Sequence, residues 1–275
     1  MRWLRKNFTG IIAVLVLVYL FVPIAVIALM SFNNPKGKFN ISWNEFSTDA
    51  WTSLCSVPGV CSSFVTSIEI GIVATIIATI LGTMISFGLV RYRFRGRSST
   101  NLLIFLPMAT PEVVMGASLL ALFLNMRFPL GIVTVMVAHI MFIISFVVVT
   151  VKARLQGMDP RLEEAAMDLY ASPSAVFRHV TFPLVLPGIL GAALLGFSLS
   201  FDDFIISFFN AGTLVTFPIY IWGAAQRGIP VQVNALATIV FTVALLIVLS
   251  SQLVGARRRR ALERPAIAMD TLPRS

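Results

Sequence analysis

The chain of 275 residues carries little charge. Asp, Glu, Lys and Arg together make up 12% of it, about half the share found in an average soluble protein. Hydrophobic residues make up 57%, and the mean hydropathy is +0.90. Because there are too few polar side chains to cover a globule in water, the natural solvent for this surface is lipid. The composition therefore excludes a water-soluble domain of this length.

Motifs for nucleotide, metal and nucleophilic chemistry are also missing. No Gly-x-x-x-x-Gly-Lys-Ser/Thr run occurs, so the chain should not bind ATP through a P-loop. The only histidines, His139 and His179, are expected in a membrane span and in a loop, where neither completes a metal site. There is no Ser/His/Asp set either. We therefore expect no enzymatic activity, no catalytic residue, no metal and no directly bound cofactor.

The net charge of +9 raises the question of nucleic-acid binding. The basic residues, however, occur in short clusters between long apolar runs. This pattern is typical of the loops that orient a membrane protein. We therefore expect a lipid bilayer, and no nucleic acid, as the partner of these charges.

Six apolar stretches are long enough to cross a bilayer as α-helices. They are residues 10–30, 64–90, 102–124, 131–151, 184–209 and 233–254. The first is too long for the apolar region of a signal peptide, and no small-x-small cleavage site follows it, so we expect it to remain as a span. The sequence thus predicts an all-α integral membrane protein with six transmembrane helices in a single domain over residues 1–275.

The distribution of Lys and Arg predicts the orientation. If the N-terminus is cytoplasmic, all but four of the 21 Lys and Arg residues lie on the cytoplasmic side. The exceptions are Lys36, Lys38, Arg127 and Arg227. The positive-inside rule therefore places both termini in the cytoplasm. The basic run at residues 257–260 fits an anchor beside anionic lipid, and a dedicated partner site is the alternative.

The chain has two cysteines, Cys55 and Cys61, both in the first loop outside the cytoplasm. Disulfides persist in that kind of compartment, and Pro58 with Gly59 between the cysteines favours a tight turn. A disulfide between them is one interpretation, and two unpaired thiols are the other.

The cytoplasmic loop at residues 152–183 is too polar to insert in lipid, yet it has helix signals. Asp159 and Pro160 mark a helix start, and residues 161–170 then read as a short amphipathic helix. A second short helix begins near Pro173 and is expected to end at residues 181–183. Such a helix pair suits docking into a groove on a soluble partner.

This loop resembles the cytoplasmic signature of permeases in binding-protein-dependent ABC importers. That pattern is Glu-Ala-Ala, three residues, Gly, nine residues, Ile, one residue, Leu-Pro. The matching residues are Glu164, Ala165, Ala166 and Pro183. Val180 and Phe182 are mild changes, but Tyr170 occupies the glycine position. Because glycine there permits a tight turn, Tyr170 is expected to turn differently or to reshape the dock.

Within these importers the chain is most similar to the spermidine/putrescine permeases of the second of two types. The residues that suggest this lie at 91–96, 106–114, 198–204, 218–222, 227–228 and 234–236. The resemblance implies a type I ABC importer permease (MetI-like) fold in the bacterial inner membrane, working by alternating access. It also implies three partners: a second permease subunit, two copies of a cytoplasmic ABC ATPase that uses ATP and Mg²⁺, and an external solute-binding protein. The implied ATPase-coupling residues are Glu163, Glu164, Ala165, Ala166, Asp168, Tyr170 and Pro183.

Four acids lie within predicted spans: Glu69, Glu112, Asp202 and Asp203. Charges at membrane depth are expensive and usually face a cavity or a partner. Prolines just before Glu112 should open the helix there. Since adjacent helical residues point about 100° apart, one of Asp202 and Asp203 is expected to meet substrate and the other a partner permease or an N-terminus.

Acids beside aromatic residues such as Phe201 and Trp222 suit a small cationic substrate, through charge pairing and cation–π contact. We therefore expect a polyamine path, which an anion would not favour. A sugar, ferric iron or a cationic peptide remains as another substrate. A proton-coupled secondary transporter is the alternative of a different class, although no inverted repeat is apparent.

Overall fold

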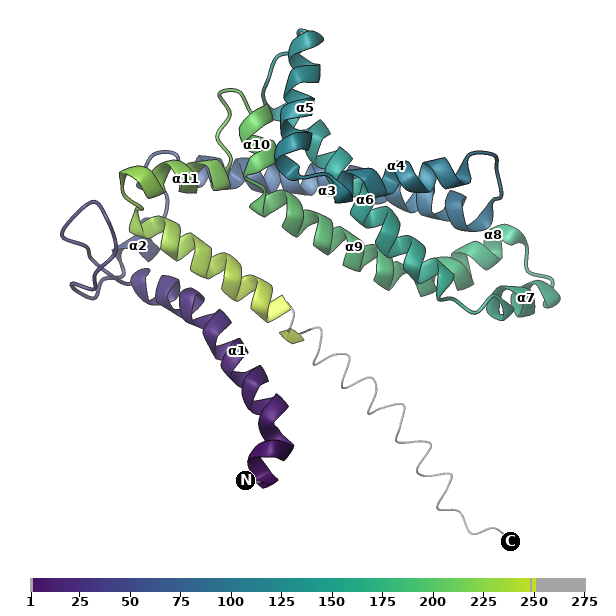
Figure 1. The fold of residues 1–275 in the computed structure, drawn as a ribbon, viewed down its shortest axis with the longest axis horizontal. Coiled ribbons are helices and arrows are strands. Elements are labelled where there is room, and N and C mark those ends of the chain that lie inside the picture. The colour runs from purple at the N-terminus through teal and green to yellow at the C-terminus, as the bar shows by residue number, and fades with distance from the viewer. Residues whose placement is uncertain (1, 248, 251–275) are drawn as a thin grey trace. The chain divides into compact units, whose positions relative to one another are not determined.

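The structure is a computed structural model that describes residues 2–247 and 249–250. Its helices are α1 (Arg2–Met30), α2 (Asp49–Thr52), α3 (Val60–Arg91), α4 (Arg97–Ala109), α5 (Glu112–Asn125), α6 (Ile132–Gln156), α7 (Arg161–Asp168), α8 (Pro173–Val176), the π-helical turn η1 (Phe177–Thr181), α9 (Phe182–Asp202), α10 (Ile205–Asn210), α11 (Phe217–Arg227) and an apolar helix over Val231–Ile247 (Figure 1). Within these described residues the one β-bridge joins Asn33 and Phe46. The predicted all-α class is therefore confirmed. The basic run at residues 257–260 lies outside the described residues.

Four helices are long and apolar enough to cross a membrane. They are Phe8–Met30 within α1, Val60–Arg91, Ile132–Gln156 and the run Pro173–Asp202. The pair α4 and α5 counts as a fifth span if its two halves cross together, and Val231–Ile247 is apolar but shorter. The predicted continuation of that last helix to residue 254 lies beyond the part of the chain that the structure describes. By length and composition, four or five of the six predicted spans are therefore present.

The third predicted span, residues 102–124, is not one continuous helix. α4 ends at Ala109 and α5 begins at Glu112, with a bend of 106° between them. Thr110 and Pro111 both have extended backbone, with ψ of 132° and 133°. Proline has no N–H to donate and disfavours helical geometry in the residue before it. The sequence-based expectation of an opened helix holds, but the opening is a full break.

The fifth predicted span, residues 184–209, is also broken. α9 ends at Asp202, the backbone of Asp203 is extended with ψ of 120°, and α10 begins at Ile205. The carboxylate of Asp203 accepts hydrogen bonds from the N–H groups of Ile206, at 3.2 Å, and Ser207, at 2.8 Å. These bonds satisfy the free amides at the start of α10, so the chain restarts a helix instead of continuing the first one.

At its other end this span is longer than expected, because Pro183 does not end the preceding short helix. α8, η1 and α9 form one run of 30 residues, Pro173–Asp202. In η1 the N–H of Phe182 donates to the carbonyl of Phe177, five residues back. A wider π turn accommodates a proline, which lacks an N–H and would crowd the carbonyl four residues before it. The prediction of a helix end at residues 181–183 was wrong.

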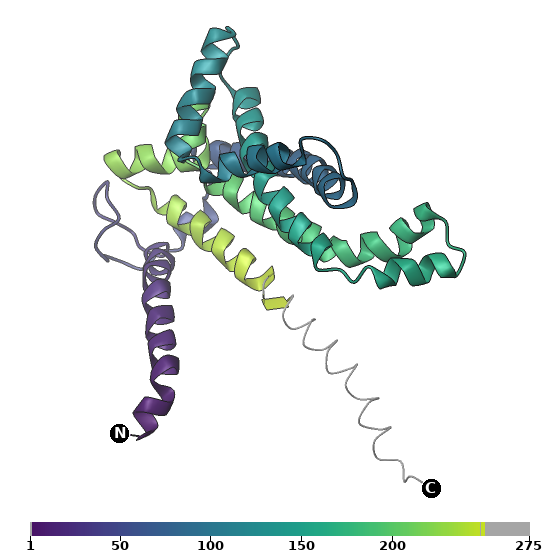
Figure 2. The same cartoon turned by 45° about the vertical axis from the view of Figure 1, so that its right-hand side comes forward.

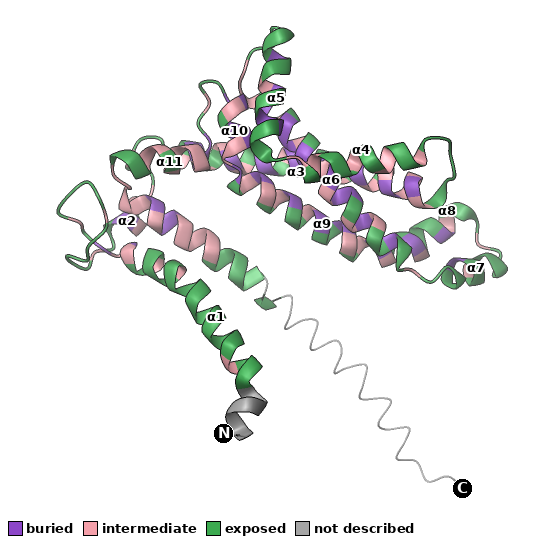
Figure 3. Ribbon diagram, in the orientation of Figure 1, coloured by how far each residue is buried: buried purple, intermediate pink, exposed green. Residues whose placement is uncertain are grey.

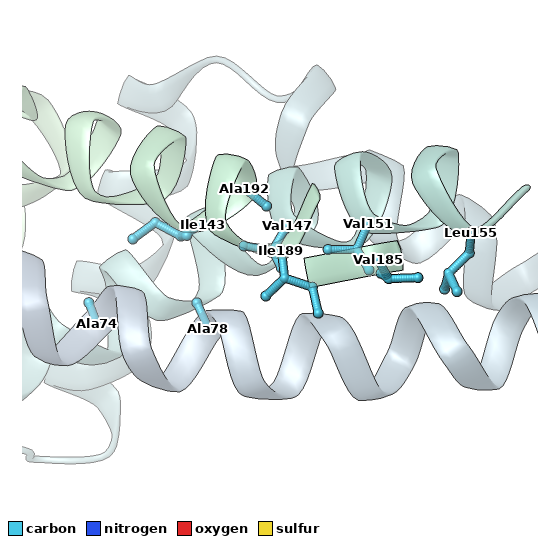
Figure 4. Packing of buried hydrophobic residues seen from close by; sticks show 9 residues of the cluster. All are labelled: Ala74, Ala78, Ile143, Val147, Val151, Leu155, Val185, Ile189 and Ala192. Carbon is cyan, nitrogen blue, oxygen red and sulfur yellow. The ribbon is translucent and has the colours of Figure 1, made fainter. Parts of the chain in front are cut away.

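The chain divides into two groups of contacts: Gly59–Gly223, and Met1–Pro58 with the described part of Ala224–Ser275. In the first group α3, α6 and α9 lie side by side in both ribbon views (Figures 1 and 2). Their shared apolar core consists of Ala74, Ala78, Ile143, Val147, Val151, Leu155, Val185, Ile189 and Ala192 (Figure 4). Small side chains on α3 against branched ones on α6 and α9 allow this close packing.

In the second group, α1 is exposed along nearly all of its described length (Figure 3). Such an apolar surface suits lipid or another membrane helix. The loop after α1 is held by Asn33, whose amide donates to Asn40 Oδ1 at 2.6 Å and to the carbonyl of Ser42 at 2.8 Å. Phe32 stacks on Trp51 with ring centroids 5.0 Å apart. The loop therefore has a defined conformation, which side-chain hydrogen bonds and ring stacking stabilise.

Candidate functional site

The loop between α6 and α9 is attached to the helices through Glu163. Its carboxylate accepts two hydrogen bonds from the guanidinium of Arg91, the last residue of α3, in a bidentate ion pair. The Thr181 hydroxyl in η1 donates to Glu163 Oε1 at 2.5 Å. Glu163 therefore links α7 to two other elements, and bidentate Arg–carboxylate pairs are among the strongest polar contacts in proteins.

This environment holds the pKa of Glu163 below its ordinary value. The main cause is the hydrogen bonding from Arg91, which the burial of the carboxylate opposes and the Thr181 hydroxyl supports. Groups that donate to the ionised form favour that form. Glu163 is consequently a carboxylate throughout the neutral pH range.

Beside this ion pair lies a groove of about 610 Å³ between the end of α3 and the elements α7, α8 and η1. Its lining is mostly apolar and includes Met84, Phe87, Met167 and Phe177. Across this groove the loop is joined to α3 by the Arg91–Glu163 pair and by the rings of Phe87 and Phe177, whose centroids lie 5.5 Å apart.

The other predicted coupling residues point mainly away from the chain. Glu164, Ala165 and Asp168 are exposed on α7, Ala166 is half-buried, and Pro183 is exposed in the first turn of α9. Leu162 and Leu169 add apolar surface to α7 and are exposed as well. An exposed short helix with apolar and acidic side chains has the form of a docking element.

Tyr170 does not change the turn in the expected way. Its φ is +60°, so it adopts the left-handed conformation that glycine usually supplies after a helix. The N–H of Ala171 donates to the carbonyl of Ala166, and the N–H of Tyr170 to that of Met167, which is the Schellman pattern. The Tyr170 side chain is 99% exposed. The tyrosine therefore keeps the glycine-type turn and adds a projecting ring to the loop.

Tyr170→Gly is expected to make this turn more stable by about 1 kcal/mol, because a left-handed backbone costs an L-residue about that much. The measurement is hydrogen exchange of the Ala171 amide in the assembled transporter, which should slow about fivefold. Leu169→Gly is the matched control: Leu169 is also exposed, but its φ is −85°, so glycine there should speed exchange. Faster exchange in both variants would contradict the argument.

At the opposite end of α9, the break before α10 separates the roles of the two aspartates. Asp203 is 7% exposed and caps α10, whereas Asp202 is exposed. Glu112 lies in the first turn of α5, also exposed, and the charges of Asp203 and Asp202 both act on it. The structure thus brings together three of the four predicted acids, of which Asp202 and Glu112 are exposed.

The fourth acid, Glu69, is exposed on α3, and the described interactions do not join it to the other three. Phe201 is occupied by packing, since its ring lies 5.8 Å from that of Phe64 and 5.9 Å from that of Phe197. Trp222 is 56% exposed and lies against Phe204, with centroids 5.2 Å apart. Trp222 is therefore the more accessible of the two predicted aromatic residues.

Sequence reasoning did not single out His139 of α6, which lies beside the break between α9 and α10. Its ring is 2% exposed, and its Nε2 lies 3.3 Å from Asp203 Oδ2. The signal was available, because an ionisable residue inside a predicted span is a functional candidate by default. Its partner, 64 positions later, could not be read from the sequence.

Neither Cys55 nor Cys61 is a free thiol in the structure. A disulfide between them, one of the two interpretations from the sequence, is tested by a mass measurement under non-reducing conditions, in which two free thiols would contradict it. In the described part of the chain, no group of three or more His, Cys, Asp or Glu side chains is arranged to hold a metal ion.

The sequence matches the family model of the binding-protein-dependent transport system inner membrane component over residues 78–262. It is 37% identical over 237 residues to the spermidine/putrescine transport system permease protein PotC of Haemophilus influenzae, covering 86% of this chain and 91% of that protein. It is 36% identical to PotC of Escherichia coli K12, covering 92% and 94%. Identity to the putrescine transport system permease protein PotI of the same organism is 34%, covering 86% of each.

Solved structures with a similar fold are parts of ABC transporters. One is a bacterial alginate ABC transporter in complex with an alginate pentasaccharide-bound periplasmic protein, with a TM-score of 0.63 and 14% identity, covering 93% of this chain and 96% of that one. Another is the MetNI methionine ABC transporter in an inward-facing conformation, with a TM-score of 0.57 and 13% identity, covering 74% and 95%. At these identities the similarity is one of fold.

Proposed function

Because the chain belongs to the family of binding-protein-dependent transport system inner membrane components, we propose that it forms half of the path by which an ATP-driven importer carries a polyamine, spermidine or putrescine. The observation that carries the substrate assignment is that exposed Asp202 and Glu112 lie where two membrane helices break, close enough for their charges to interact. Like charges gathered within membrane-spanning segments are costly in free energy, and a cation bound between them offsets that cost.

The groups at this site suit an oligoamine in more than one way. Carboxylates accept charge-assisted hydrogen bonds from ammonium groups, and exposed Trp222 on Phe204 offers an aromatic face for a cation. A neutral sugar would not need the clustered acids, and an anion would be repelled by them. The relatives whose names include spermidine or putrescine support the same assignment.

At the other end of α9 we assign the docking of an ATPase to the exposed residues of α7 and to Tyr170. ATP and Mg²⁺ would act on that partner, in two copies, and the chain itself would hydrolyse nothing. A second permease would supply the other half of the path, and an external solute-binding protein would deliver the polyamine. The loop end and both termini would then face the cytoplasm, in keeping with the distribution of Lys and Arg.

Neutralising the exposed acids tests the substrate path. In the complete transporter in proteoliposomes, Glu112→Gln and Asp202→Asn are each expected to raise the KM for spermidine about tenfold or more, because a lost charge-assisted hydrogen bond is worth about 1.5–3 kcal/mol. Glu45→Gln is the control, since Glu45 is an exposed acid in the loop after α1.

The readouts are labelled spermidine and putrescine uptake and polyamine-stimulated ATP hydrolysis. A panel of a neutral sugar, ferric iron and a basic peptide accompanies them. Unchanged KM values in both acid variants, or stimulation by another member of the panel in place of the polyamines, would overturn the polyamine assignment.

A further inference from the structure

A single buried histidine connects α6 to all three parts of the α9–α10 break. His139 Nδ1 lies 2.6 Å from the hydroxyl of Ser200 in α9, and Nε2 lies 3.0 Å from the hydroxyl of Ser207 in α10. Nε2 is also 3.3 Å from Oδ2 of Asp203, in the break itself. All four side chains are less than a tenth exposed. Polar groups so deeply buried are retained where their partners are complete.

The far end of α10 is tied to the same helix. The Thr134 hydroxyl in α6 donates to the carbonyl of Asn210 at 2.7 Å. The Asn210 amide also donates to the carbonyl of Gly116 at 3.3 Å, which joins α10 to α5. α10 is therefore held at both of its ends, and His139 is the contact that holds the end next to the acids.

The orientation of Asp203 decides that of Asp202. Asp203 is turned inward, where its two oxygens accept bonds from the α10 amides and Oδ2 faces His139. Neighbouring residues at a helix end point in different directions, so Asp202 is left exposed beside Glu112. A buried carboxylate that lost its side-chain partner would be costly to keep in place.

We propose that His139 is a positioning residue: it fixes the break between α9 and α10, and so keeps Asp202 at the surface where the substrate passes. The part concerning transport rests on the proposed function, whereas the part concerning the break does not. His139 acts through Asp203 and its neighbours and does not itself touch the substrate.

The chemistry of the contacts sets which substitutions retain the function. A carboxylate only accepts hydrogen bonds, so we assign a proton to Nε2, which lies 3.0 Å from the Ser207 hydroxyl and 3.3 Å from Asp203 Oδ2, and have Nδ1 accept from the Ser200 hydroxyl. A glutamine side chain places an N–H at about the level of Nε2, whereas asparagine is too short to reach Asp203. His139→Gln should therefore retain the link to the break, and His139→Asn and His139→Leu should lose it.

Hydrogen exchange on the complete transporter tests the break directly. In His139→Leu and His139→Asn, the amides of Ile206 and Ser207 should exchange at least about tenfold faster, because their acceptor Asp203 is no longer held. His139→Gln should stay near the wild-type rate. The matched control is Ser145→Ala, which removes a buried α6 hydroxyl that has no hydrogen-bond partner in the structure and should leave both amides unchanged.

Spermidine uptake then separates positioning from folding. The His139→Leu variant should raise the KM for spermidine about tenfold, whereas the His139→Gln variant should keep it near the wild-type value. The Ser145→Ala variant should have no effect on this KM. Unchanged exchange in the leucine and asparagine variants, equal acceleration in the Ser145 control, or faster exchange with an unchanged KM would each overturn the proposal. If Asp202→Asn itself leaves KM unchanged, the part of the proposal that concerns transport fails, and the exchange rates still decide whether His139 holds the break.

Discussion

Replacing Glu163 with alanine is expected to lower polyamine uptake at least about tenfold while the transporter still assembles. The change removes both hydrogen bonds from Arg91 and the one from Thr181, which join the loop to α3 and η1 across a partly unfilled groove. Breaking a fully buried pair costs about 3–5 kcal/mol. Because the Arg91 side chain is 41% exposed, we expect about 1–3 kcal/mol here.

The control is a double-mutant cycle. Arg91→Ala alone leaves the Glu163 carboxylate without its two guanidinium donors and with only the Thr181 hydroxyl. The double variant should be less damaged than the two single effects combined, by about 1 kcal/mol or more. Uptake and ATP hydrolysis are measured in the same proteoliposomes, since a loosened loop should reduce uptake per ATP hydrolysed. Strictly additive effects would contradict a direct role of the pair.

The same pair predicts how stability depends on pH. The folded state lowers the pKa of Glu163 from its ordinary 4.5, so the contribution of the carboxylate is fully present above that value. It is lost as the pH falls through the lower folded value. Thermal unfolding of wild type should therefore approach that of Glu163→Gln on acidification, with a constant difference near neutral pH. Glu164→Gln, at an exposed neighbour, should unfold like wild type.

Gly82→Ala is expected to lower the free energy of unfolding by about 1–3 kcal/mol, the range for overpacking a tight core. A Cβ at Gly82 would lie 2.6 Å from Cγ1 and 2.8 Å from Cβ of Val147, and 3.3 Å from the carbonyl oxygen of Ile144. α3 and α6 would have to separate, and their contact is part of the core that also holds α9.

Gly88 provides a matched control on the same helix, because a Cβ there meets nothing within 4 Å. Gly88→Ala should leave stability unchanged or raise it by about 0.5–1 kcal/mol, since alanine restricts the unfolded chain more than glycine does. The measurements are the melting temperature and the yield of monodisperse complex. Equal melting temperatures for the two variants would show that α3 and α6 are not packed as described.

Much of the membrane fold follows from hydropathy alone. The predicted spans at residues 64–90 and 131–151 agree closely with Val60–Arg91 and Ile132–Gln156. An apolar run of bilayer length can satisfy its backbone hydrogen bonds in lipid by forming an α-helix, so its conformation follows from its composition. Breaks within a span are harder to predict, since the average hydropathy of the whole span does not show them. Pro111 was visible in the sequence, but whether a proline bends a helix or ends it depends on its neighbours in space. The break at Asp203 depends on His139, which lies elsewhere in the chain.

The acids of the site could be predicted from the sequence because charged residues are rare within apolar spans. Which of Asp202 and Asp203 is accessible required the packing of α10, and the sequence left both open. Glu163 was grouped with the exposed coupling residues, yet it is 9% exposed, because its partner Arg91 lies 72 positions earlier. Local patterns predict which residue types gather in a region, whereas long-range contacts decide which way each one points.

The unbroken run from Pro173 to Asp202 has a geometric consequence. Its 30 residues span about 45 Å at 1.5 Å per residue. With no hinge between the loop and Asp202, the angular phase between the two ends is set by residue number. One inserted residue would swing the Asp202 carboxylate by about 100° about the helix axis, whereas seven, close to two full turns, would nearly restore its direction. The number of residues along this helix therefore keeps its two ends in register.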